Sequence, residues 1–307
     1  MQLQKQKKPR LETIKRKLVK WSLEPARQRM KRAAFVLKPI KAAAIETPVE
    51  VHFLTGKNYW YQTIFCAYSL LLYSGVQPRI VFHDDGTLSK EHADLLLRTI
   101  PNSSLKTIVD TSKTISSNFP IKRFPVINRT TWGLMMMRKL ALTHAGSTGW
   151  KLFLDSDMLF VNTPKLLIDW LRQPREPCHL MDISRCYGYT DALMSSLVEG
   201  QIPGRLNAGL WGMRSEEINW EVVEHWATQL IEGEGMKYLI EQAMTAMLFA
   251  GRPSLVFPRE EYVVCPRPAE ALNPKGVLHH YAGDTRPLMI RHGWKRILDQ
   301  AAARMGN

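Results

Sequence analysis

The sequence predicts an α/β fold, a mixed and mainly parallel sheet flanked by helices on a Rossmann-like plan. Short apolar runs with strand character alternate with longer segments that are apolar at helical spacing, and this alternation requires crossover connections between parallel strands. One apolar run, in the sequence WKLFLDSDMLFV at positions 150–161, ends abruptly in two carboxylates. Ligands on such sheets bind outside the carboxyl ends of the strands. With 307 residues, 45% of them hydrophobic, the chain has ample material for a core.

The first half of the chain gives the clearer pattern. Pro39 to Pro48 reads as a linker, which we assign to residues 42–48. Strands are predicted at 49–54, 79–82, 105–109 and 151–154. Helices are predicted between them at 59–73, from a Ser89 cap to residue 97, and at 130–144.

The second half is less regular. A helix is predicted from Pro164 to residue 171, a short strand at 178–181, and a loop at 187–204. The segment 206–213 is apolar and contains Gly209 and Gly212, which weaken a strand unless another group approaches its backbone closely. It is predicted either to line a site or to be an ordinary core strand. Helices are expected at 218–231, 236–249 and 290–303.

Asp155 and Asp157 form the most informative pair in the sequence. Side chains two positions apart in an extended chain point to the same side, so both carboxylates can reach one cation. Two like charges at a buried strand end are costly unless a positive group lies between them. A divalent metal ion is the simplest candidate, and a turn or helix cap is the alternative.

The net charge of +14 belongs mainly to one end of the chain. Residues 1–41 contain 14 Lys or Arg and only two acidic residues, Glu12 and Glu24, which leaves the remaining 266 residues with a net charge of +2. A nucleic-acid-binding core would carry basic residues over its whole binding face. We therefore expect no nucleic-acid partner.

Within residues 1–41, Leu11, Ile14, Leu18 and Trp21 form one apolar stripe of a helix that Pro25 is expected to end or kink. The lysines and arginines around them make this an amphipathic basic arm. It is predicted either to lie on an anionic membrane surface or to remain a docked or solvated arm. We divide the chain into this arm, the linker and a main domain at 49–307.

The sequence predicts a cytoplasmic protein, with peripheral contact at the inner face of a membrane if the arm binds lipid. No apolar run approaches the length of a membrane span, and the N-terminus does not read as a secretion signal. The four cysteines are scattered without a Cys-x-x-Cys pair, as is typical of a reducing compartment.

Four short motifs follow one another along the chain. The first is Asp155-x-Asp157, the second Asn207-Ala208-Gly209, the third Glu241-Gln242, and the last runs from His280 through Gly283 and Arg286 to Pro287. Together they resemble the motifs of the family 8 glycosyltransferases, whose second motif is an Asn-Ala-Gly strand and whose third is an Asp-Gln pair. These are metal-dependent retaining enzymes of the GT-A fold and include glycogenin and bacterial surface-glycan galactosyltransferases. The resemblance covers about residues 49–287.

The resemblance implies a role for each matching residue. Asp155, Asp157 and His280 would hold Mn²⁺ or another divalent cation, completed by the diphosphate of a nucleotide-sugar, for which UDP-sugar is the family expectation. Sugar hydroxyls would be bound by Asp182, Asn207 and Gln242. Other contacts to the donor are expected from Asn58, Lys139 (or Arg138 after a shift of one residue), Ser156, Gly209, Gly283 and Arg286, the last replacing the family's Lys.

The implied reaction is transfer of a sugar to a glycan or other hydroxyl acceptor with retention of configuration. Glu241 could act as a covalent nucleophile, or the leaving diphosphate could assist same-face substitution, which the resemblance favours. Thr55-Gly56-Lys57 departs from the acidic residues that follow the family's first strand, which puts the identity of the base in doubt. A nucleotidyltransferase and an inactive binding or scaffold module are the alternative functions.

Overall fold

The structure is a computed structural model that describes the backbone of residues 10–41 and 43–305. Within these ranges, the side chains of residues 10–21, 135, 136 and 305 are outside the description.

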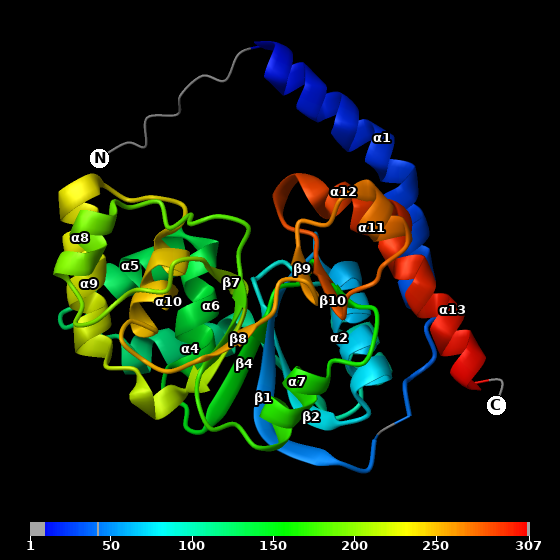
Figure 1. The fold of residues 1–307 in the computed structure, drawn as a ribbon, viewed down its shortest axis with the longest axis horizontal. Coiled ribbons are helices and arrows are strands. Elements are labelled where there is room, and N and C mark those ends of the chain that lie inside the picture. The colour runs from blue at the N-terminus through cyan, green and yellow to red at the C-terminus, as the bar shows by residue number, and fades with distance from the viewer. Residues whose placement is uncertain (1–9, 42, 306–307) are drawn as a thin grey trace.

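A seven-stranded sheet forms the centre of the molecule, with helices on both faces (Figure 1). The strand order is β3-β2-β1-β4-β7-β6-β8. Strand β7 is antiparallel to its neighbours β4 and β6, and the other pairings in this sheet are parallel. The predicted α/β fold with a mixed, mainly parallel sheet is thereby confirmed. The strands span Glu46–Thr55 (β1), Gln77–Asp84 (β2), Ser103–Lys106 (β3), Trp150–Leu154 (β4), Cys178–Met181 (β6), Leu206–Arg214 (β7) and Leu255–Phe257 (β8).

A second, three-stranded sheet brings distant parts of the chain together. It contains β5 (Met158–Phe160), β10 (Leu278–His280) and β9 (Tyr262–Val264), in that spatial order. Strands β5 and β10 are antiparallel, with His280 opposite Met158. The N–H of Tyr281 donates to the carbonyl of Asp157 at 2.8 Å. Backbone pairing therefore fixes His280 beside the carboxylates that follow β4.

Helices surround both sheets. Those before the carboxylates are α2 (Trp60–Ser74), α3 (Lys90–Thr99), α4 (Ile108–Asn118), α5 (Pro125–Gly133) and α6 (Met135–His144). Those after them are α7 (Lys165–Arg172), α8 (Asp191–Ser196), α9 (Trp220–Glu234), α10 (Ile240–Leu248), α11 (Pro268–Leu272), α12 (Arg286–Leu288), a π-helical turn at Met289–Gly293, and α13 (Trp294–Met305).

Three local predictions are wrong. The third strand ends at Lys106, because the Thr107 hydroxyl and the Asp110 carboxylate form a capping box that starts α4 at Ile108. The predicted helix at 130–144 is divided between α5 and α6 by extended backbone at Leu134. The predicted loop at 187–204 contains the short helix α8, which is capped by Thr190.

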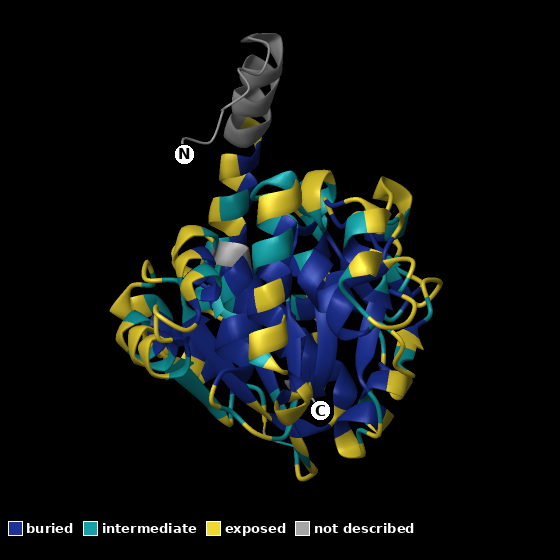
Figure 2. Ribbon diagram, turned by 90° about the vertical axis from the view of Figure 1, so that its left-hand side faces the viewer, coloured by how far each residue is buried: buried dark blue, intermediate teal, exposed yellow. Residues whose placement is uncertain are grey.

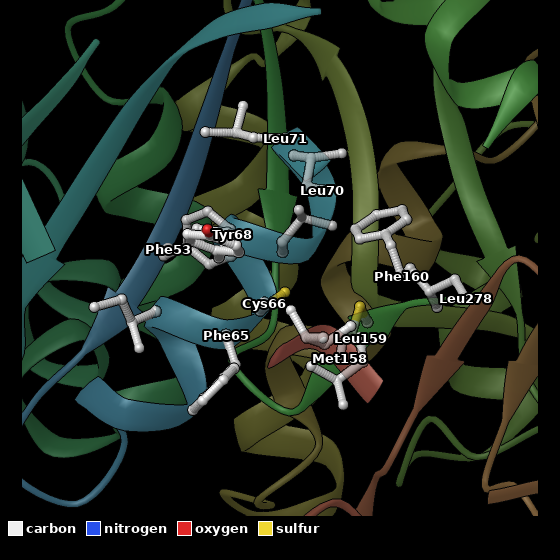
Figure 3. Close-up of a cluster of buried hydrophobic side chains, with 14 of the residues drawn as sticks. Phe53, Phe65, Cys66, Tyr68, Leu70, Leu71, Met158, Leu159, Phe160 and Leu278 are labelled. Carbon is white, nitrogen blue, oxygen red and sulfur yellow. The ribbon is translucent and has the colours of Figure 1, made fainter. Parts of the chain in front are cut away.

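Apolar side chains pack on both faces of the large sheet. One cluster joins β1 and β2 to α1, α2, α7, α13 and the small sheet, and the other joins β4 and β7 to α4, α5, α6, α9 and α10. Figure 3 shows part of the first, where Phe53, Phe65 and Phe160 are fully buried. Burying a side chain of this size contributes roughly 1.5–3 kcal/mol. This packing holds β5, and with it the carboxylate turn, against α2.

Helix α1 (Arg10–Phe35) extends from the N-terminal region along the body of the molecule. Of the two effects expected of Pro25, an end or a kink, the end is wrong, because the helix continues to Phe35. Burial of Leu23, Met30 and Ala34 in the core stabilises the helix beyond Pro25. Figure 2 shows the described part of α1 with buried and exposed residues along its length. The side chains of the predicted apolar stripe at 11–21 lie outside the described residues.

The boundary between arm and domain also differs from the sequence-based division. Strand β1 begins at Glu46, so the predicted linker at 42–48 is partly strand. Residues 23–37 contribute to the main core although they fall within the predicted arm. Within the described residues, no helix is both long and apolar enough to cross a membrane.

Candidate metal and diphosphate site

Asp155 and Asp157 lie in the turn between β4 and β5, at the carboxyl end of the central parallel strands. The N–H of Asp155 donates to the carbonyl of Gly209 at 2.7 Å, which ties this turn to β7. The side chain of Asp155 is 23% exposed, whereas that of Asp157 is 8% exposed. The site therefore has one buried acid and one that reaches solvent.

The imidazole of His280 completes the cluster that the sequence predicts. Its Nε2 lies 3.3 Å from Oδ1 of Asp157 and 3.8 Å from Oδ2 of Asp155. One ligand atom from each of the three residues lies within 4.8 Å of the others. The other nitrogen, Nδ1, is buried and has no hydrogen-bond partner among the described residues.

These donors fit a divalent cation. With a cation bound, the imidazole proton would lie on Nδ1 and the Nε2 lone pair would face the ion, so the site would offer two hard oxygen donors and one imidazole. Gly209 makes this arrangement sterically feasible, since a Cβ atom there would lie 2.4 Å from Cε1 of His280. The close approach expected for the small-residue segment 206–213 is therefore an approach to His280.

Two cationic side chains neutralise the carboxylates. Nζ of Lys139 lies 2.6 Å from Oδ1 of Asp155, and the guanidinium of Arg286 donates to Oδ2 of Asp157 from Nε at 3.0 Å and from Nη2 at 2.6 Å. Burial alone would raise the pKa of Asp157, but His280 and Arg286 lower it well below its ordinary value. Burial alone would lower the pKa of Lys139, but the surrounding carboxylates raise it. Both ion pairs therefore persist at neutral pH.

A cavity of about 280 Å³ opens beside the carboxylates. Several of its lining residues were predicted as site residues, namely Lys139, Asp155, Ser156, Asp157 and Arg286. The hydroxyl of Ser156 is turned toward the protein, where it bonds the Thr63 hydroxyl at 2.7 Å and the Leu54 carbonyl at 3.2 Å. Ser156 therefore positions the turn.

Tyr59, which with Asn58 matches the family in the segment after its first strand, also lines the cavity. Asp85 and Tyr238 line it as well and were not predicted, the latter with 69% of its surface exposed. Asp85 follows β2 as Asp155 follows β4, so its position at a strand end was a usable signal. Tyr238 lies in the connection between α9 and α10, where the sequence shows no comparable pattern.

Lys139 rather than Arg138 contacts the carboxylates. Arg138 donates from Nη1 to the Asp85 carbonyl at 2.9 Å and lies over the Trp132 ring. Lys139 lines the cavity and Arg138 does not, and which of the two contacts the donor stays a prediction. Asn58 is exposed and does not line the cavity, whereas its neighbour Tyr59 does.

Two of the three predicted sugar-binding residues, Asp182 and Asn207, are hydrogen-bonded to each other. Nδ2 of Asn207 donates to Oδ2 of Asp182 at 2.8 Å, and Oδ1 of Asn207 accepts from the N–H of Gly209 at 2.9 Å. Gln242 is oriented by a 2.8 Å bond from Nε2 to the Cys186 carbonyl. Gly283 has a φ of +56°, in the left-handed region that favours glycine.

Glu241 lies behind this surface. It is 2% exposed, does not line the cavity, and has the Thr245 hydroxyl 3.5 Å from Oε1. Burial raises its pKa to about 7, an effect that Asp155 increases and Lys139 opposes. Glu241 acts on the site through its charge, which helps to raise the pKa of Lys139.

Comparison with solved structures identifies the fold as the GT-A fold of glycosyltransferases. The galactosyltransferase LgtC, solved with donor and acceptor sugar analogues, matches 83% of this chain and 95% of its own, with a TM-score of 0.53 and 16% identity. The mouse xyloside xylosyltransferase 1 matches 78% of this chain and 99% of its own, with a TM-score of 0.53 and 12% identity.

A third structure, the bifunctional glycosyltransferase WbbM, matches 86% of this chain with a TM-score of 0.52 and 16% identity, and this chain spans about half of its length. At these identities the likeness establishes the fold. No protein-family model and no curated protein matches the sequence.

Proposed function

We propose that this protein is a metal-dependent, retaining glycosyltransferase of the family 8 type, which transfers a sugar from a nucleotide-sugar, UDP-sugar by expectation, to a hydroxyl of a glycan or other acceptor. The observation that carries the proposal is the convergence of Asp155, Asp157 and His280 at the end of β4 in a GT-A fold. Backbone pairing between β5 and β10 supports it, because this pairing brings together residues more than a hundred positions apart.

Donor binding follows from the charges around the cavity. Asp155, Asp157 and His280 would hold Mn²⁺, which when bound supplies a Lewis acid to the leaving diphosphate. Lys139 and Arg286 add two fixed positive charges, and the guanidinium fork of Arg286 suits phosphate oxygens. Tyr59 presents an aromatic ring beside Arg286, at 5.9 Å from its guanidinium carbon to the ring centroid.

The position of Glu241 favours same-face substitution over a covalent intermediate. A nucleophile must reach the anomeric carbon, but Glu241 is buried behind Lys139 and does not line the cavity. In the proposed step the bond from the anomeric carbon to the diphosphate breaks, the acceptor oxygen bonds to the same face, and the leaving diphosphate takes the acceptor proton. Asp182, Asn207 and Gln242 would orient the sugar hydroxyls.

The predicted membrane contact and cytoplasmic location are also part of the proposal. Residues 1–41 would supply a basic surface that contacts the inner face of a membrane from the cytoplasm, although part of this segment packs in the core. Exposed Arg29, Arg32, Lys38 and Lys41 continue the positive charge of the undescribed N-terminal residues toward the main domain. Flotation of the full chain with vesicles of anionic lipid tests this, and equal flotation by a chain lacking residues 1–21 would contradict it.

Activity against a panel of UDP- and GDP-sugars tests the proposed reaction. We expect metal-stripped protein to hydrolyse or transfer from a donor only after Mn²⁺ is restored. Asp157→Ala should abolish this activity, whereas Asp169→Ala, at an exposed position on α7, should not. Release of pyrophosphate from a nucleoside triphosphate would instead indicate a nucleotidyltransferase, and the absence of any donor-induced thermal shift would indicate a binding module.

A further inference from the structure

The described surface has a second hollow, which is larger than the cavity at the carboxylates. A groove of about 670 Å³ opens at the edge of the large sheet, where β6 and β8 meet the end of α10. We call it the edge groove. Its principal lining residues are His179, Ile202, Pro203, Arg205, Phe249 and Pro253.

A buried histidine with one unused nitrogen forms part of this groove. His179 is 3% exposed, and its Nδ1 lies 2.8 Å from the carbonyl of Leu180. That contact places the proton on Nδ1 and leaves Nε2 as a hydrogen-bond acceptor. Nε2 has no hydrogen-bond partner among the described residues, and the ring is held edge-on against Phe249 with centroids 5.2 Å apart. Burial lowers the pKa of His179, which favours this neutral, accepting form.

The groove also presents one free positive charge. Arg252 is paired with Glu217, with Nη1 2.8 Å from Oε2, so its charge is offset. Arg205 is exposed and forms no ion pair among the described residues, and its Nη2 contacts only the sulfur of Met181 at 3.4 Å. A ligand in the edge groove would therefore meet an unpaired guanidinium beside an accepting imidazole.

Much of the remaining lining is apolar. Pro203 and Pro253 expose hydrocarbon surface and limit backbone movement, whereas Ile202 and Phe249 are buried beneath them, at 5% and 1% exposed. Apolar faces with a few well-placed polar groups suit a ligand that has both C–H faces and hydroxyl groups. A sugar ring has this character, and the guanidinium adds a preference for a sugar that carries an acidic group.

The edge groove adjoins the candidate active site through the residues that hold Asp182. Met181 and Arg205 line the groove, and the N–H of Asp182 donates to the carbonyl of Arg205 at 2.7 Å. Asp182 in turn bonds Asn207, whose amide oxygen is fixed by Gly209 next to His280. Along α10, Glu241 beside the site and Phe249 at the groove are about 12 Å apart at the ordinary helical rise.

We propose that the edge groove binds an acidic oligosaccharide, namely the part of an extended acceptor that lies away from the reacting hydroxyl. This inference rests on the proposed function. Nε2 of His179 accepts a hydrogen bond from a sugar hydroxyl, Arg205 binds the acidic group, and the two prolines contact the ring faces. The substrate class is accordingly a glycan chain rather than a single sugar.

Oligosaccharide binding in the absence of donor and metal tests the inference. The probes are an array of defined neutral and acid-bearing oligosaccharides, followed by calorimetric titration of the tightest binder. His179→Asn keeps a donor near Nδ1 and removes the acceptor, and we expect about tenfold weaker binding, the effect of one lost hydrogen bond. His179→Gln, whose amide reaches toward the Nε2 position, should restore part of it. Arg205→Gln should weaken acid-bearing ligands at least tenfold and neutral ones little.

Matched controls separate this effect from general damage. His225→Asn and Arg172→Gln change exposed residues of the same kinds elsewhere and should leave binding unchanged. No binding by any oligosaccharide, or binding that neither His179→Asn nor Arg205→Gln weakens, would overturn the inference. Because Arg205 is exposed, its variant remains informative if His179→Asn does not fold. If the protein binds oligosaccharides but transfers no sugar, the inference about the edge groove stands and the proposed reaction is refuted. If it transfers sugar in a Mn²⁺-dependent way that neither His179→Asn nor Arg205→Gln changes, the proposed reaction stands and the inference about the edge groove is refuted.

Discussion

Cε1 of His280 lies 2.4 Å from the position that a Cβ atom on Gly209 would occupy. Glycine at 209 thus makes room for the imidazole that faces Asp155 and Asp157. Gly209 lies in β7 of the large sheet, and His280 lies in β10 of the small sheet. The geometry of the candidate metal site therefore depends on strands of both sheets.

Gly209→Ala should displace His280 and weaken binding of Mn²⁺ by about 10–100-fold, the range seen when the support of a ligand is lost. Calorimetry with Mn²⁺ measures this. Gly133→Ala is the matched control, because a Cβ atom at Gly133 has nothing within 4 Å. Unchanged Mn²⁺ affinity in a folded Gly209→Ala protein would contradict the role of His280 as a ligand.

Arg286→Gln should weaken UDP binding in the presence of Mn²⁺ by about 10–100-fold, as expected for lost hydrogen bonds from a charged group. Affinity for Mn²⁺ alone should not fall, because the variant removes a cation from Asp157. Arg286→Lys should retain part of the UDP affinity, and Arg259→Gln, an exposed control, all of it. Equal losses for Mn²⁺ alone and for UDP would show that Arg286 serves only to hold the site together.

Glu241→Gln should stabilise the protein at neutral pH. The pKa of Glu241 is about 7 in the folded protein against an ordinary 4.5, so the folded state retains a proton that the unfolded state has lost between these values. In the wild type, the contribution of Glu241 to the free energy of unfolding is fully present below pH 4.5. It declines by about 3 kcal/mol in total as the pH rises to about 7. The melting temperature of Glu241→Gln relative to wild type should therefore rise across this interval.

Glu232→Gln, at an exposed position on α9, should show no such trend. A constant difference in melting temperature between Glu241→Gln and wild type from pH 4.5 to 8 would mean that Glu241 is already ionised in the folded protein.

Acid should destabilise the folded protein through a second buried group, the pair of His52 and His83. Nδ1 of His52 lies 2.9 Å from Nε2 of His83, and burial lowers the pKa of both imidazoles. Their neutral forms are favoured in the folded state, so the stability that they confer is present above the unfolded pKa of about 6.5 and is lost as pH falls below it. His83→Phe should flatten this loss in thermal denaturation between pH 6.5 and 5. If the loss of thermal stability between pH 6.5 and 5 is the same in His83→Phe and wild type, this histidine pair is not its cause.

Part of the site was predictable from local patterns. The apolar runs on either side of Asp155 and Asp157 identified β4 and β5. The two carboxylates do lie close together, as the sequence predicts, but they lie in a turn and not in extended backbone, so the turn brings them together. No local pattern predicts that His280 pairs with Met158, since strand pairing between distant segments depends on the whole fold. The order of the four motifs supplied that link through the family resemblance.

Other features depend on tertiary packing that local sequence does not encode. The basic residues around Pro25 suggested a separate arm, but burial of Leu23 and Met30 carries α1 past the proline and into the core. The glutamate at 241 could be read as a nucleophile until the fold placed it behind Lys139. The capping box of Thr107 and Asp110, in contrast, was legible in the sequence, and it marks where the third strand must stop.

The location of Mn²⁺ in crystals grown with Mn²⁺ and UDP tests the central claim most directly. An anomalous difference map should show a single strong peak bounded by carboxylate oxygens of Asp155 and Asp157 and by Nε2 of His280. Crystals of His280→Ala should show that peak weakened or absent. A peak that does not contact His280, or no peak between the two aspartates at saturating Mn²⁺, would contradict the account.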